Sequence, residues 1–66
     1  MTPKLSRRET QLLSLLADGA SEKIAARKMG IEHNTIKGYA RGIRSKMKVE
    51  RMIAAVSKAF RLGMLQ

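Results

Sequence analysis

The residues whose types and spacing most clearly indicate a chemical role lie in the stretch from His33 to Met47 and just beyond it. Four cationic side chains recur there at the three- and four-residue spacing of one helix face: Lys37, Arg41, Arg44 and Lys48. Such a line of charges suits docking onto a polyanion. Lys37 and Arg41 lie one turn apart, and both can donate hydrogen bonds to N7 and O6 of guanine. The spacing therefore predicts a helix that enters the major groove of DNA.

Holding that helix in place requires an apolar seam and supporting elements. The seam lies one residue before the cationic line: Ile36, Ala40, Ile43 and Met47. A capping box formed by Ser6 and Glu9, a Ser21 cap and several glycine stop signals delimit the other helices. We expect an all-α fold with helices at approximately 6–17, 22–29, 33–47 and 50–62, forming a single domain over residues 1–66. Two short helices, a tight turn containing Gly30 and a longer helix have helix-turn-helix spacing.

Composition narrows the class of partner. Fourteen Lys and Arg against five Asp and Glu give a net charge of +9, and nucleic acid is the commonest counter-charge for a small basic domain. With no cysteine and one histidine, we expect no disulfide, metal or cofactor. No nucleophile–base pair is apparent, so we do not expect an enzyme. Because no apolar run reaches membrane-spanning length and no signal peptide precedes the first helix, we expect a cytoplasmic, nucleoid-associated protein.

The fourth predicted helix is apolar on two sides. Ile53, Val56 and Phe60 recur at helical spacing and are expected to form its core face. A second side carries the residues that we assign to a homodimer interface: Met52, Ala55, Ala59 and Leu62. The alternative is that both sides belong to one wide core face.

Two further expectations concern the second and third helices. In the second helix, Ile24, Ala25 and Met29 are expected to point inward. In the third, Gly38 and Gly42 each disfavour the helix by about 1 kcal/mol relative to Ala. Missing side chains at these positions would let the backbone approach the floor of the groove, and the alternative is simple tolerance of glycine there.

Residues 5–19 read LSRRETQLLSLLADG, which resembles the opening L-[ST]-x-R-E-x-x-[VL]-L-x-L-[LI]-A-x-G of the LuxR/FixJ-type helix-turn-helix family, also called GerE-like. The match continues without a gap through Ser21, Lys23, Ala26, Met29, Ile31, Thr35, Ile36, Lys37, Tyr39, Ile43, Lys46, Met47 and Val49. The chain departs from the family pattern at Ile24, Ala25, Tyr39 and Met52, and Glu32 replaces the usual Ser or Thr cap of the third helix. The initial Met favours a short, stand-alone bacterial member.

Family members use the third helix to read the major groove and the fourth as a dimer surface. By position, the resemblance implies that Lys37, Gly38 and Arg41 face base edges, and Asn34 at the helix start suits pairing with adenine. Phosphate contacts are assigned to Ser21, Lys23, Thr35, Tyr39 and Lys46. The alternative for Lys46 is a solvated basic face, and for Tyr39 a place at the edge of the core.

These observations predict a sequence-specific transcriptional regulator that binds double-stranded DNA as a homodimer. The alternative is a protein-interaction module that docks on RNA polymerase or on a larger regulator, with its charge meeting an acidic partner. The apolar second side of the fourth helix motivates that alternative.

Overall fold

The computed structural model describes residues 2–65 and contains four helices: α1 (Arg7–Ala17), α2 (Glu22–Met29), α3 (His33–Met47) and α4 (Met52–Arg61). The all-α prediction is confirmed. Bounds agree to within one residue for the first three helices, whereas α4 begins two residues later and ends one residue earlier than predicted. The two end residues of the predicted 1–66 domain lie outside the described residues.

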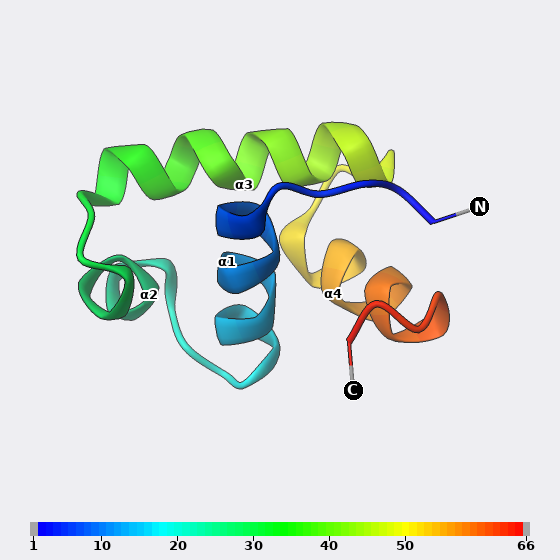
Figure 1. The fold of residues 1–66 in the computed structure, drawn as a ribbon, viewed down its shortest axis with the longest axis horizontal. Helices are drawn as coiled ribbons and strands as arrows, with labels where there is room; N and C mark the ends of the chain where they lie inside the picture. Colours follow the sequence, from blue (N-terminus) through cyan, green and yellow to red (C-terminus); the bar gives the residue numbers. More distant parts are fainter. Residues whose placement is uncertain (1, 66) are drawn as a thin grey trace.

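The long helix α3 lies along one side of the molecule, and the other three helices lie beneath it (Figure 1). It packs against α1, α2 and α4, and α1 also contacts both α2 and α4. The four seam residues of α3 are fully buried in this arrangement, as predicted: Ile36, Ala40, Ile43 and Met47. One side of α3 is thereby fixed against the core, and the opposite side is left outermost.

Local capping explains where α1 and α2 begin and end. The predicted capping box is present in α1, because the Ser6 and Glu9 side chains each accept a hydrogen bond from the other residue's amide. Ser21 caps α2 by accepting from the Ile24 amide. Gly30 then takes a left-handed conformation (φ 69°) that ends α2 and turns the chain into α3.

The orientation of α4 differs from the prediction. Ile53 and Phe60 were expected in the core, but they are 74% and 47% exposed. Ala55 and Ala59, which were assigned to the dimer interface, are fully buried within this chain and have no surface to offer a second copy. The prediction failed because both sides of α4 are apolar, so the periodicity identifies two candidate faces without ranking them. Small alanines let α4 approach its neighbours closely, which places the larger side chains outside.

A smaller correction applies to α2. Ala25 and Met29 are buried as predicted, together with Ala26, but Ile24 is 40% exposed. The three buried residues share one face of the helix, and Ile24 points away from it. None of the helices within residues 2–65 is long and apolar enough to cross a membrane.

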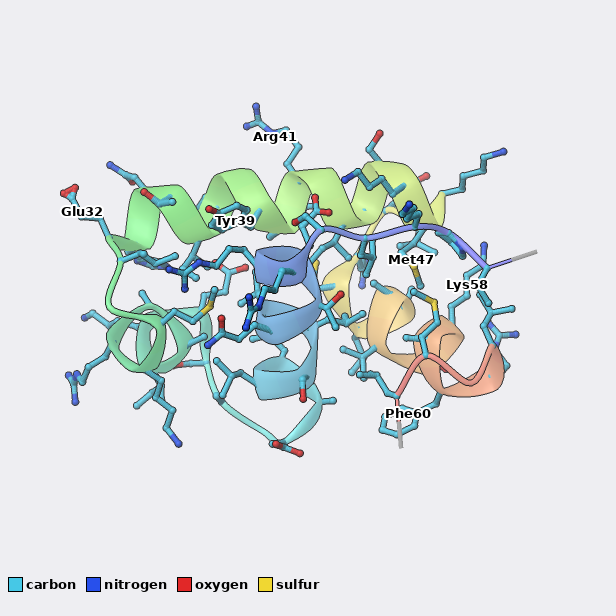
Figure 2. The ribbon with its side chains drawn as sticks, viewed as in Figure 1. Glu32, Tyr39, Arg41, Met47, Lys58 and Phe60 are labelled. Atoms are coloured by element: carbon cyan, nitrogen blue, oxygen red, sulfur yellow. The ribbon has the colours of Figure 1, made fainter. Side chains whose placement is uncertain are left out.

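The start of α3 has no side-chain cap. Glu32 occupies the N-cap position with extended backbone, but its side chain makes no capping hydrogen bond. Figure 2 shows the Glu32 carboxylate extending away from the body of the molecule. This agrees with the departure at this position, where Glu replaces the Ser or Thr that would cap the helix.

Glu32→Ser should therefore raise the free energy of unfolding by about 0.5–1 kcal/mol, because a serine hydroxyl can accept a hydrogen bond from the first-turn amides. Urea unfolding followed by circular dichroism would measure the change. Glu32→Ala is the matched control, since it removes the carboxylate without supplying a cap. A serine variant no more stable than the alanine variant would contradict the assignment.

Candidate nucleic-acid interface

The outer face of α3 carries all the residues that were predicted to meet DNA bases. Asn34, Lys37, Gly38 and Arg41 are exposed, while the seam on the other side of the same helix is buried. Figure 2 shows Arg41 projecting from α3 on the side opposite α1. The structure therefore brings these four residues onto one accessible surface.

The cationic groups on this surface have no internal counter-charge. Among residues 2–65, the carboxylates within 4.0 Å of a basic side chain are Glu9, beside Lys46, and Glu22, beside the His33 imidazole. The side chains of Lys37 and Arg41 make neither an ion pair nor a hydrogen bond within that part of the chain. Their charge is consequently available to an external anion.

Three of the residues predicted to contact phosphates lie at helix starts with polar groups accessible. Ser21 and Lys23 lie at the beginning of α2, and Thr35 lies in the first turn of α3; all three are exposed. The Ser21 oxygen accepts from the Ile24 amide at 3.1 Å, which leaves its O–H free to donate. Tyr39 is half-buried and packs against the core, so the core-edge alternative describes its ring.

Lys46 has a partner that the sequence did not predict. Its Nζ donates to Glu9 Oε1 at 2.7 Å, and the Ser6 amide donates to the same oxygen at 2.8 Å. Glu9 is only 6% exposed. Lys46 is therefore paired with a buried carboxylate 37 positions away in the sequence, while its own side chain stays 45% exposed. Sequence reasoning had recognised Glu9 as a capping residue, but nothing local to either residue indicates that they meet.

Electrostatics favour the ionised form of Glu9. Burial alone would raise its pKa, but the Lys46 ammonium together with the Ser6 amide and hydroxyl outweighs burial and lowers the pKa below the ordinary value of 4.5. Because the folded pKa lies below the unfolded one, the ionised carboxylate stabilises the fold at pH values above the unfolded pKa. That contribution disappears as the pH falls through the lowered folded pKa.

The two glycines of α3 have different surroundings. A Cβ atom added to Gly42 would collide with the Glu9 carboxylate, whereas one added to Gly38 would meet open space. Gly42 is therefore glycine because Glu9 occupies its side-chain space, and the predicted approach of Gly42 to a groove floor is wrong. Gly38 remains on the accessible face.

The far end of α3 is also held by a side chain. Lys58 of α4 donates from Nζ to the Met47 carbonyl at 2.8 Å, and Figure 2 shows the two residues close together. A cation at the carbonyl end of a helix satisfies an otherwise unpaired acceptor and favours the helix dipole. Glu9 and Lys58 thus fix α3 from two neighbouring helices.

Comparison with known protein families matches residues 3–59 to the family described as bacterial regulatory proteins, luxR family. The chain belongs to the luxR family. Its four helices form the helix-turn-helix DNA-binding domain of a LuxR-type transcriptional regulator, and the family is one of transcription factors, not enzymes.

This LuxR-type domain is similar to parts of larger regulators. It is 39% identical over 64 residues to the HTH-type transcriptional activator RamA of Corynebacterium glutamicum, covering 97% of this chain and 23% of RamA. Its structure resembles that of the transcription factor GerE, with a TM-score of 0.87, 26% identity, and coverage of 94% of this chain and 92% of GerE. It also resembles Vibrio cholerae VqmA in a complex with ligand and DNA, with a TM-score of 0.82, 35% identity, and coverage of 91% of this chain and 26% of VqmA. The chain thus spans about a quarter of RamA and of VqmA.

The different surroundings of Gly38 and Gly42 allow the position of Glu9 to be tested with two substitutions on α3. Gly38→Ala should raise the unfolding free energy by about 0.5–1 kcal/mol, because alanine favours helix and the space is open. Gly42→Ala should lower it by about 1–2 kcal/mol, because the added methyl displaces a carboxylate held by Ser6 and Lys46. Urea unfolding of both variants checks the pair. Equal effects of the same sign would contradict the position of Glu9.

Proposed function

We propose that this LuxR-type domain reads a specific sequence of double-stranded DNA by placing α3 in the major groove, and that it does so at the nucleoid in the bacterial cytoplasm. The observation that carries the proposal is the pair Lys37 and Arg41, exposed, one turn apart and without a partner within residues 2–65. Four helices sharing one core support a single domain over residues 1–66.

The base-reading role divides among four residues. Lys37 and Arg41 donate to guanine N7 and O6, and Asn34 pairs with adenine near the start of the helix. Gly38 lies between them with no side chain, so the backbone of α3 can approach the groove floor at that point. The open space beside Gly38 supports this role, because nothing inside the fold requires a glycine there.

Phosphate contacts position the helix without reading sequence. We assign them to Ser21, Lys23, Thr35 and Tyr39, which provide hydroxyl, ammonium and first-turn amide donors on the helix-turn-helix unit. Lys46 stays in this set, because it donates to the buried Glu9 carboxylate while its side chain is 45% exposed, which leaves further N–H donors for a phosphate. Its second role in this proposal is to position α3.

Binding measurements on two alanine variants test the reading face. Lys37→Ala and Arg41→Ala should each weaken binding to a selected duplex by about 1–3 kcal/mol and relax base preference at one position. Selection of duplexes from a random pool, followed by titration, supplies both readouts. Arg61→Gln, which removes one exposed charge from α4, is the control and should leave base preference unchanged. Wild-type affinity and preference in both alanine variants would disprove the reading face.

The same domain is proposed to act as a homodimer through α4, with the contact on a different side from the one predicted. Ile53 and Phe60 form an exposed apolar strip on this helix, and Figure 2 shows Phe60 on the side away from α3. Leu62 at the end of the helix is also exposed, and Met52 is half-buried. A two-fold contact on this strip would leave both α3 helices free to face DNA.

A binding module for RNA polymerase or a larger regulator is the competing use of that strip. The same exposed apolar residues would then meet a different protein. Sedimentation of the purified chain separates the two, because a self-associating strip forms dimers without any other protein present.

Ile53→Ser should raise the dimer dissociation constant by about tenfold or more while leaving the fold intact, because an exposed isoleucine is buried only on association. Sedimentation equilibrium over a concentration series measures the constant. Ile24→Ser is the matched control, since it removes the same side chain from an exposed position on α2. A monomeric wild type, or equal weakening by Ile24→Ser, would contradict the α4 dimer.

A further inference from the structure

The carboxyl end of α3 brings three lysines to one hollow of about 420 Å³: Lys46, Lys48 and Lys58. Two of them are engaged within the fold, since Lys46 donates to Glu9 and Lys58 donates to the Met47 carbonyl. The Lys48 side chain is exposed and has no hydrogen bond or ion pair within residues 2–65. Lys48 is therefore an unpaired cation at this end of the reading helix, as is Arg44 in its last turn.

The backbone of Lys48 is unusual for a residue with a side chain. Its φ of 58° and ψ of 48° are left-handed, and among residues 2–65 it is the only non-glycine residue with a positive φ. Gly19, Gly30 and Gly63 occupy the other positive-φ positions. The Lys48 amide donates to the Arg44 and Ser45 carbonyls, a contact that glycine would make equally well. Nothing inside the fold accounts for a lysine in a conformation that disfavours one.

The length of α3 indicates where this lysine would lie on DNA. Lys48 follows Arg41 by seven positions, which is about 10 Å along a helix axis. The major groove is about 12 Å wide, so a helix whose middle lies over the bases carries its end toward the phosphates at the rim. Strained backbone conformations are retained at binding sites when the side chain is needed there.

We propose that Lys48 binds a backbone phosphate at the edge of the groove, and that this contact explains a lysine at a position where glycine would be conformationally preferred. The inference rests on the proposed reading of DNA by α3. It adds a contact beyond the helix proper, one position past the last residue of α3.

The test measures affinity for a selected duplex as a function of salt concentration. Lys48→Gly and Lys48→Asn both suit a left-handed conformation and remove the charge, so each should lower affinity about fivefold to tenfold near 0.1 M salt and flatten the salt dependence by about one unit. Base preference should stay unchanged, and urea unfolding should show no loss of stability for Lys48→Gly. Lys48→Arg should keep near wild-type binding. Arg61→Gln, with the same loss of charge on α4, should not flatten the salt dependence.

Two results would overturn the inference. One is an unchanged salt dependence in Lys48→Gly. The other is an equal flattening in Arg61→Gln, because it would show that only the net charge of the chain matters. The same measurements test the proposed reading of DNA by α3 separately. If Arg41→Ala loses base preference while Lys48→Gly binds normally, only the Lys48 contact is wrong. If the wild-type chain binds no duplex at all, both are wrong.

Discussion

The Glu9 carboxylate is the constraint on which the presentation of α3 depends. It lies at the start of α1, accepts hydrogen bonds from the Ser6 amide and from Lys46, and fills the space beside Gly42. Burying the Glu9 carboxylate is costly, and the Ser6 amide and the Lys46 ammonium offset that cost only in the arrangement where both reach it. The observed rotation of α3 satisfies the carboxylate, the ammonium and the glycine together. That rotation turns the seam inward and leaves Lys37 and Arg41 outside.

The small size of the chain shapes the rest of the molecule. A domain this short buries only about 60% of its unfolded surface, and alanines supply much of the core. Small core residues let the helices approach closely, with five larger buried side chains filling the centre: Leu12, Leu13, Ile36, Ile43 and Met47. Because the helices pack closely, other large residues such as Ile53 and Phe60 remain exposed. Excess positive charge and exposed apolar surface thus both favour association with partners.

Much of the fold could be predicted from sequence, because its signals are local. The α3 seam, the Ser6 and Ser21 caps and the glycine stops each depend on residues within one or two turns of one another. The predictions that failed, and the contacts that were missed, concern how the helices pack against one another. The inward side of α4 could not be ranked when both sides were apolar, and the contact between Glu9 and Lys46 joins residues far apart in the chain. For the same reason, no local pattern indicates that Gly42 faces a carboxylate while Gly38 faces open space.

One titration tests most directly whether the outer face of α3 meets DNA. The isotope-labelled chain would be titrated with a half-site duplex that is long enough for one copy only, and backbone amide signals would be followed by nuclear magnetic resonance. The largest shifts should occur at Asn34, Lys37, Gly38 and Arg41, and the signals of Ile53 and Phe60 should change little. Largest shifts on α4, with the α3 signals unmoved, would contradict the proposed reading of DNA by α3.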